Sequence, residues 1–232
     1  MPTVHNSHRD YLRQLVESHL NTVKLNLMKN GWRKLADSEF RVSEIFKCGR
    51  QIYLERLFPE KAESEIDFDN VKSAVLPGTA LHDCFQKYDL NHAVPEEDKV
   101  YYDNGKIVLN GHIDQTLVHK DLIVDYKSVG QFSWKYILDK PKVGHVHQIN
   151  AYCAIYVRGF FAIAYLHKET YEHKVYCAKA NIKTFNGDVK RLEGVALAIE
   201  TKKIPPAKPM EEWNCKYCGH KKFCKQLVNS DK

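Results

Sequence analysis

The spacing of apolar residues along the chain predicts its main helices. Leucine and valine positions three and four residues apart are typical of the buried face of a helix, and Asn30-Gly31 ends the first such pattern. Three expected helices cover residues 8–29, 145–158 and about 186–202. Two more are expected to begin at Ser43 and at Pro77-Gly78.

The middle of the chain changes to the alternating pattern of strands. Lys120-Asp121 suits a tight turn, and the proline-rich stretch 203–209 is expected to be a stiff linker. This layout predicts an α/β fold with one central mixed sheet flanked by helices, in which a helical segment over 1–40 precedes one domain over 41–232. The expected strands are 106–110, 111–118, 122–127, 160–167 and 172–179.

Composition adds a few constraints. The chain has 232 residues, of which 44% are hydrophobic and 28% charged, and its net charge of +6 fits either a polyanionic partner or solvated surface lysines. The first residues are polar and no apolar run reaches the roughly 18 residues of a membrane helix, so we expect a cytoplasmic protein without a membrane partner. In that reducing compartment, the seven cysteines are more typical of metal ligands or catalytic groups than of disulfides.

Two carboxylates and a lysine provide the first candidate chemistry. Asp125 and Lys127 are two residues apart on a predicted strand, so they share a face, and Asp114 on the preceding strand can approach Asp125. Adjacent carboxylates repel each other unless a cation lies between them, and Mg or Mn prefers oxygen ligands. With a lysine that stabilises charge on a phosphate, this set is sufficient to hydrolyse a phosphodiester. An exposed charge pattern is the alternative, weakened by the apolar neighbours Ile123 and Val124.

Other polar residues carry no function when they are read alone. Gln148 and Tyr152 lie four residues apart on one face of a predicted helix, where Gln148 is expected to be polar surface and Tyr152 core. His82 is expected to be a structural histidine, and His112 and His145 have equally weak claims to a function.

Closely spaced cysteines near the C-terminus predict a metal centre. Cys215, Cys218 and Cys224 need a fourth soft ligand to complete a zinc site or an iron–sulfur cluster, and their spacing does not choose between the two. Cys48 is the expected fourth ligand because it lies in a polar segment, with His220 as the alternative. The cysteines expected to be small core residues are Cys84, Cys153 and Cys177.

Taken together, these residues resemble the RecB-like branch of the PD-(D/E)XK nuclease superfamily, specifically its Cas-four type, which carries an iron–sulfur cluster. The resemblance follows the family's motif order over nearly the whole chain from residue 40, although Ile113-Asp114 stands where the family has Pro-Asp. The matching stretches are 43–54 with Cys48, 78–82, 111–114, 123–127, 148–152 and the tail with Cys215, Cys218 and Cys224.

The resemblance implies a restriction-endonuclease-like core and gives several residues a role. It implies that Lys127 is catalytic and that Gln148 and Tyr152 contact the active site or DNA. The implied ligands of Mg or Mn are His82, Asp114, Asp125 and the backbone carbonyl of Tyr126. The implied ligands of a four-iron, four-sulfur cluster, which would join the N- and C-terminal segments, are Cys48, Cys215, Cys218 and Cys224.

The resemblance also implies an activity, the hydrolysis of DNA by an exonuclease, commonly at single-stranded ends. Members act in CRISPR spacer acquisition, in viruses or in DNA repair, so other DNA-processing or CRISPR adaptation proteins are expected partners. The alternatives are a DNA-binding subunit that acts through a partner nuclease or helicase, and a structural zinc protein. The intact set Asp114, Asp125 and Lys127 favours an active enzyme, and the sequence contains no Gly-x-x-x-x-Gly-Lys-Ser/Thr loop, which argues against an intrinsic ATPase.

Overall fold

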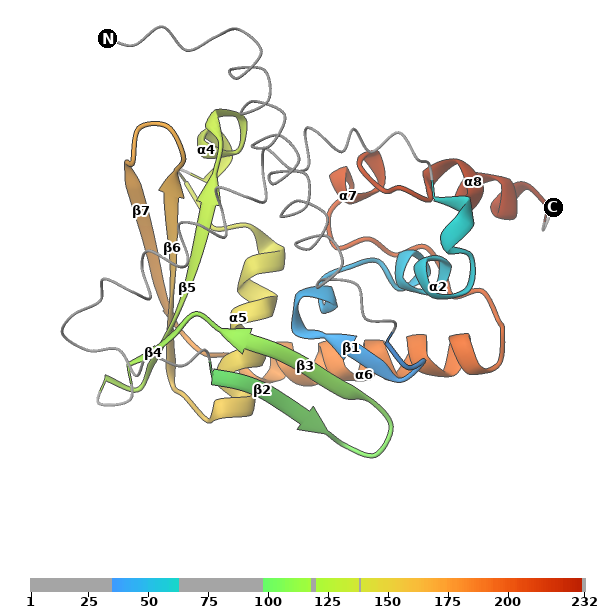
Figure 1. Cartoon of the computed structure of the whole chain (residues 1–232), viewed down its shortest axis with the longest axis horizontal. Coiled ribbons are helices and arrows are strands. Elements are labelled where there is room, and N and C mark those ends of the chain that lie inside the picture. Colours follow the sequence, from blue (N-terminus) through green and yellow to red (C-terminus); the bar gives the residue numbers. More distant parts are fainter. Residues whose placement is uncertain (1–34, 63–97, 118–119, 138, 231–232) are drawn as a thin grey trace, which may run out of the picture. The chain divides into compact units, whose positions relative to one another are not determined.

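A computed structural model describes residues 35–62, 98–117, 120–137 and 139–230 of the chain (Figure 1). The chain divides into two compact units, Met1–Ala36 and Asp37–Lys232, and the fold described below lies in the second. The helices expected over 8–29 and from Pro77-Gly78 lie outside the described residues, as do His82 and Cys84.

The described residues form two mixed sheets, of which the first has three strands in the order β1-β3-β2. β1 (Glu39–Arg41) runs parallel to β3 (Val108–Ile113), and β2 (Asp98–Asp103) runs antiparallel along the other edge of β3. The apolar side chains of these strands that belong to the core are Phe40, Val100, Leu109 and Ile113.

The second sheet has four strands in the order β4-β5-β6-β7. β5 (Leu122–Val129) and β6 (Phe160–His167) form a parallel pair at its centre, while β4 (Gln115–Leu117) and β7 (His173–Lys179) pair antiparallel at its edges. Most apolar side chains of β5 and β6 are buried, whereas β7 is exposed along most of its length. The parallel pair is therefore the rigid centre of this sheet.

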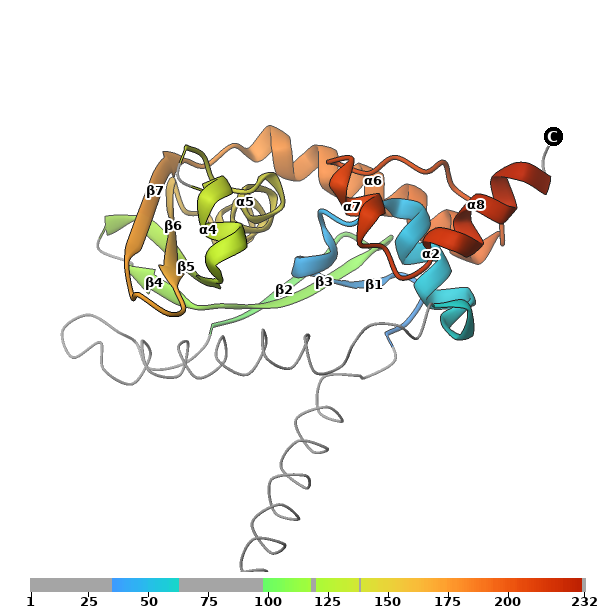
Figure 2. The same cartoon turned by 90° about the horizontal axis from the view of Figure 1, so that it is seen from above.

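Helices connect and cover the parallel pair. α4 (Gln131–Ile137) and α5 (Val143–Tyr156) lie between β5 and β6 in the chain, and Figure 2 shows both on the same side of the four-stranded sheet. α6 (Ile182–Glu200) contacts both α5 and α2 (Gly49–Leu57). The tail contains α7 (Trp213–Lys216) and α8 (Lys221–Ser230). Within the described segments, no helix combines the length and the apolar character needed to cross a lipid bilayer.

The α/β fold with a mixed sheet flanked by helices is confirmed, and β5, β6, β7, α5 and α6 form where apolar spacing predicts them. The single central sheet is instead divided into two sheets, because the chain bends at Asp114 between β3 and β4. The boundary expected between strands 106–110 and 111–118 is wrong, since β3 continues through Gly111. A Cβ on Gly111 would lie 3.0 Å from Tyr152 and 3.0 Å from Val42, so glycine lets both side chains pack against the strand.

The helix expected from Ser43 is also corrected. A 3-10 turn, η1, covers Val42–Glu44, and α2 begins only at Gly49, with Cys48 as its N-cap residue. The buried carboxylate of Glu44 accepts hydrogen bonds from the backbone N–H of Arg41, at 2.9 Å, and from Arg56, at 3.1 Å. These bonds fix the tight turn that delays the helix. Apolar spacing does not predict β1, β2, α4, α7 or α8, nor the second short 3-10 turn, η2 (Pro59–Lys61).

Gly49 allows α2 to approach α6 closely, and its replacement should destabilise the fold. A Cβ at this position would lie only 2.8 Å from Cγ2 of Val195 on α6. Gly49→Ala should lower the melting temperature, by the equivalent of about 1–3 kcal/mol for overpacking. Gly187→Ala is the matched control, because a Cβ there meets nothing within 4 Å. It should keep or raise the melting temperature, so equal losses in the two variants would contradict the argument.

Candidate functional site

Two charged side chains of β5 lie side by side on one face of the strand. The Nζ atom of Lys127 donates a hydrogen bond to Oδ1 of Asp125 at 2.9 Å. The Asp125 side chain is only 3% exposed and the Lys127 side chain 21% exposed. A buried carboxylate needs an opposite charge nearby, so this ion pair makes the position of Asp125 in the core tolerable.

Asp114 reaches the same place from the bend between the two sheets. Gln115 pairs with Val124 in the antiparallel register of β4 and β5, so Asp114 comes opposite Asp125. Its Oδ2 accepts a hydrogen bond of 2.7 Å from the backbone N–H of Tyr126. The side chain of Asp114 is thereby bound to β5 at the residue that follows Asp125.

α5 adds two buried polar side chains to this site. Nε2 of Gln148 donates a hydrogen bond of 3.2 Å to the hydroxyl of Tyr152. Burial raises the pKa of Tyr152 far above its usual value, and the charges of Asp125 and Asp114 raise it further. The hydroxyl therefore keeps its proton and lies in the field of both carboxylates. The expectation that Gln148 is surface is wrong, because the helix packs this face against the sheet.

The chemistry of this donor set fits a divalent cation. Asp114 and Asp125 offer carboxylate oxygens, the ligand type that Mg and Mn prefer. His82 lies outside the described residues, and the hydroxyl of Tyr126 donates a hydrogen bond to Gln115. Within the described segments, no group of three or more His, Cys, Asp or Glu side chains forms a ready metal site. A metal ion at this site would therefore need further ligands besides the two carboxylates.

A second hydrogen-bonded group, which the sequence does not point to, lies beside Lys127. Tyr165 is fully buried on β6, in register with Lys127, and its hydroxyl accepts a bond of 3.0 Å from the backbone N–H of Lys142. Nδ1 of His145 lies 2.8 Å from the same hydroxyl. Burial, then the charges of Lys127 and Lys142, lower the pKa of His145 to about 3. The only sequence signal for this group is the position of His145 one helical turn before Gln148.

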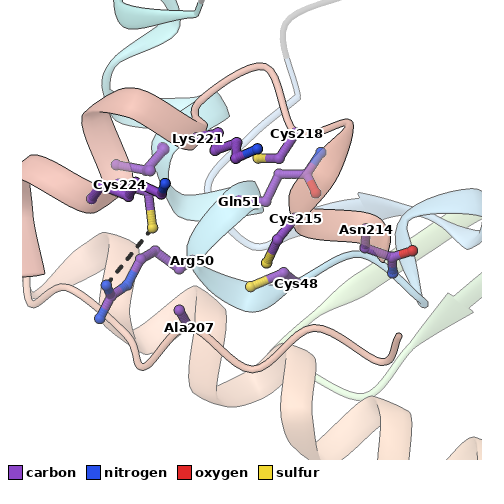
Figure 3. A pocket seen from close by; sticks show the side chains of 11 residues that line it. Cys48, Arg50, Gln51, Ala207, Asn214, Cys215, Cys218, Lys221 and Cys224 are labelled. Carbon is purple, nitrogen blue, oxygen red and sulfur yellow. Dashed lines mark hydrogen bonds between the residues drawn. The ribbon is translucent and has the colours of Figure 1, made fainter. Parts of the chain in front are cut away.

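The four cysteines implied as cluster ligands line one pocket of about 140 Å³. Cys48 caps the N-terminus of α2, Cys215 lies in α7, Cys224 lies in α8, and Cys218 lies between these tail helices. In the view of Figure 3 the sulfurs of Cys48 and Cys215 lie next to each other, whereas those of Cys218 and Cys224 lie apart from them. The fold therefore brings together thiols that are far apart in the sequence.

Cations surround these thiols. Arg50 donates a hydrogen bond of 3.8 Å to Sγ of Cys224 and another of 2.7 Å to the carbonyl of Pro205, and Lys221 and Lys225 also line the pocket. Burial raises the pKa of Cys215, and its neighbours Cys48 and Cys224 raise it further. Soft thiols beside cations are the ligand type of an anionic metal–thiolate centre, but among the residues that the structure describes the four cysteines, like the carboxylates, do not form a ready metal site.

The remaining candidates for soft ligands lie elsewhere. Nε2 of His220 lies 3.1 Å from the carbonyl of Phe58, and His220 is not among the residues that line the pocket. Cys153 is buried as expected, and burial raises its pKa to about 12. The expectation that Cys177 is a core residue is wrong, because β7 is an edge strand that leaves its thiol exposed. Cys84 lies outside the described residues.

Comparisons with known proteins identify similar folds. No protein-family model and no curated protein matches the chain. The solved structure of a protein named SSO0001 matches with 18% identity and a TM-score of 0.60, over 87% of this chain and 93% of that one. An alkaline exonuclease from Laribacter hongkongensis matches with 10% identity and a TM-score of 0.48, over 84% and 95% of the two chains. A phage-related exonuclease from Haemophilus somnus 129PT matches with 12% identity and a TM-score of 0.42, over 75% and 97%.

The likeness to SSO0001 concerns the fold, because its identity is too low to carry a function. The TM-scores of the two exonucleases are too low to carry an argument. The chemistry of the site must therefore be argued from its own residues.

The low pKa of His145 predicts a specific loss of stability in acid. In the folded protein the pKa of His145 is about 3, below its ordinary value of 6.5, so unfolding allows the ring to take up a proton. The stability that depends on neutral His145 is present above pH 6.5 and is lost as the pH falls toward 3. Wild type should therefore unfold at a lower urea concentration at pH 4.5 than at pH 7. In His145→Gln the difference between these two urea midpoints should be smaller than in wild type. His173→Gln, at an exposed histidine of β7, should keep the wild-type difference.

Proposed function

We propose that the chain is a metal-dependent deoxyribonuclease that hydrolyses phosphodiester bonds, acting as an exonuclease on single-stranded DNA ends. The observation that carries this proposal is the convergence of Asp114, Asp125 and Lys127 beside the buried pair Gln148 and Tyr152. The roles that follow in DNA processing, repair or CRISPR spacer acquisition, with partner proteins of those systems, rest on the family resemblance alone.

Each residue of the site has a distinct task in this reaction. Asp114 and Asp125 would hold Mg or Mn, with His82 and the carbonyl of Tyr126 as the further ligands that the resemblance implies. The bound ion would supply Lewis-acid polarisation of a phosphate oxygen. Lys127 carries its ammonium group to the edge of the carboxylate pair, where it can donate to an oxygen that gains charge in the transition state.

The buried pair on α5 keeps the site in order. Tyr152 retains its proton and can donate a hydrogen bond, because burial and two nearby carboxylates oppose its ionisation. Gln148 fixes the direction of that hydroxyl through their mutual hydrogen bond. Neutral His145 and Tyr165 add no charge beside Lys127, so the ammonium group remains available for an anionic substrate.

A four-iron, four-sulfur cluster is the second part of the proposal. Cys48, Cys215, Cys218 and Cys224 would hold it, and the cations around their pocket would offset the negative charge of four thiolates. Such a cluster would clamp the N-terminus of α2 onto the tail, because Cys48 and Cys215 come from distant parts of the chain. A zinc ion on the same ligands is the competing assignment, and iron analysis separates the two.

A DNA-binding subunit without activity is the alternative function. It would keep the fold, the cations and the cysteines, but it would not require the paired carboxylates. The ion pair of buried Asp125 and Lys127 next to Asp114 supports the active enzyme.

Asp125→Asn should abolish cleavage without abolishing the fold. The change keeps the shape of the side chain but removes the charge that binds the metal and pairs with Lys127. We expect the release of nucleotides from end-labelled single-stranded DNA, in the presence of Mn, to fall by about 10²-fold or more. Chelation should have the same effect on wild type. Glu200→Gln, an exposed carboxylate at the end of α6, should retain full activity.

Circular dichroism and metal binding complete this test. Asp125→Asn should keep the helical signal of wild type and should bind Mn more weakly. If a folded Asp125→Asn protein cleaves DNA at the wild-type rate, the assignment of the active site is wrong.

Cys48→Ala should remove the cluster. One lost ligand opens the metal–thiolate site, so we expect loss of brown colour and visible absorption, less than half the wild-type iron per chain, and a lower melting temperature. Cys177→Ala, at an exposed cysteine of β7, is the matched control and should keep its iron. A full iron complement in Cys48→Ala would show that the fourth ligand lies elsewhere. Zinc instead of iron in wild type would replace the cluster assignment.

A further inference from the structure

Two large aromatic side chains are exposed on one face of α4. Phe132 is 68% exposed and Tyr136 is 65% exposed. They lie four residues apart, one above the other on the helix, and their ring centroids are 5.2 Å apart with an interplanar angle of 59°. Exposed aromatic rings that gather on one element mark an interaction surface more often than scattered ones do. We call this pair the aromatic platform.

The helix that carries the platform is firmly held. Its inner face contributes Ile137, which is fully buried, and Trp134, whose ring packs edge-on against that of His167 at a centroid distance of 5.3 Å. The Nε2 atom of His167 lies 2.8 Å from Oε1 of Gln131, and the hydroxyl of Tyr176 donates to the carbonyl of Ile137. The two exposed rings are thus presented by an anchored helix, which lowers the entropy that binding must overcome.

The platform lies on the same face of the sheet as the proposed active site. Asp125, Lys127 and Val129 are in register with Ile163, Tyr165 and His167 of β6, and directly paired residues point to the same face. α4 packs on this face through Trp134, which contacts His167. Its first residue, Gln131, comes two residues after the end of β5 and four after Lys127, so the helix begins about 13 Å beyond Lys127 along the strand. Figure 1 shows α4 at the end of β5.

The charges on and just after α4 are mainly positive. Lys135 lies on α4 between the two rings in sequence, and Lys140 and Lys142 follow the helix, against one carboxylate, Asp139. Nζ of Lys142 donates to Oγ of Ser133 on α4 at 3.3 Å, which holds this cation beside the helix. The β6–β7 turn adds Lys168 against Glu169 and Glu172, so the excess of positive charge comes from the lysines on and just after α4. Aromatic faces among lysines fit a polymer that carries both π-faces and phosphates.

We propose that Phe132 and Tyr136 stack on unpaired bases of single-stranded DNA and so guide the strand into the site of Asp125 and Lys127. This inference rests on the proposed function and names the residues that select a single strand. In a duplex, neighbouring base pairs cover the faces of the bases, so the platform reads only unpaired nucleotides. Stacking accepts any base, because every base has a π-face.

The test compares DNA that has bases with DNA that lacks them. The full chain with its native metal content is titrated into three fluorescein-labelled probes of equal length, in Ca²⁺ in place of Mn, and binding is read by anisotropy. The probes are an oligothymidylate, an oligonucleotide of abasic sites, and a duplex. The F132A/Y136A double variant should lose about tenfold to a hundredfold in affinity for oligothymidylate and less than twofold for the abasic strand.

Two further variants separate stacking from other causes. The F132L/Y136L variant keeps apolar side chains without a π-face, so it should bind oligothymidylate as weakly as the alanine variant. Y101A is the matched control, because Tyr101 is 62% exposed on β2 in the other sheet, and it should bind all probes as wild type does. Normal affinity of F132L/Y136L for oligothymidylate would overturn the proposal, since it would show hydrophobic contact alone.

The remaining outcomes are equally decisive. Equal losses on thymidylate and abasic strands would overturn the proposal, as would unchanged affinity in F132A/Y136A. A wild-type dimer in solution that F132A/Y136A converts to monomer would assign this face to a second copy of the chain. If wild type shows the expected stacking but does not cleave DNA in Mn, the proposed function fails and the platform stands. If wild type cleaves and F132A/Y136A binds every probe normally, the platform fails and the function stands.

Discussion

The buried charge of Asp125 is the constraint on which the arrangement of the site depends. A carboxylate that is 3% exposed is costly unless positive charge lies next to it, and the two-residue period of β5 brings Lys127 to that place. Asp114 then adds a second negative charge opposite Asp125. Two carboxylates at such close quarters disfavour each other's ionisation unless positive charge lies near them, which is the physical reason for proposing a divalent cation at this site.

The bend that divides the sheet also determines where Asp114 lies. If β3 continued straight into β4, the alternation of side chains would decide where Asp114 points. The bend instead frees Asp114 to accept the backbone N–H of Tyr126. Gly111 supports this course of the chain, because it lets Tyr152 pack against β3 close to the bend. The two sheets and α5 therefore meet near the bend at Asp114.

Local patterns in the sequence predict the central strands and helix of this fold, but they do not predict the contacts between elements or the short helix α4. β5, β6 and α5 have long runs of apolar residues, and the spacing of Asp125 and Lys127 on a strand correctly predicts that they share a face. The burial of Gln148 and the group around Tyr165 arise from register between elements, which no local pattern contains. α4 is short, and two of its aromatic residues face outward, so its apolar spacing gives no clear helix.

The cysteine pocket shows how a distant part of the chain is brought to the tail by ordinary contacts, before any metal is considered. Arg191 of α6 donates a hydrogen bond of 2.9 Å to the carbonyl of Lys47 and another to that of Ile45, so it holds the turn that leads to Cys48. Arg50 holds the linker at Pro205, which positions the tail from the other side.

A smaller pocket links the tail to the start of α5, beside the proposed active site. Glu211 and Trp213, just before the first tail cysteine, line it together with Lys142 and His145 of the α5 N-terminus. The N–H of Lys142 holds Tyr165, which is in register with Lys127. A metal bound by the cysteines, as proposed above, would therefore also order the residues beside Lys127, because the tail and the start of α5 line one pocket.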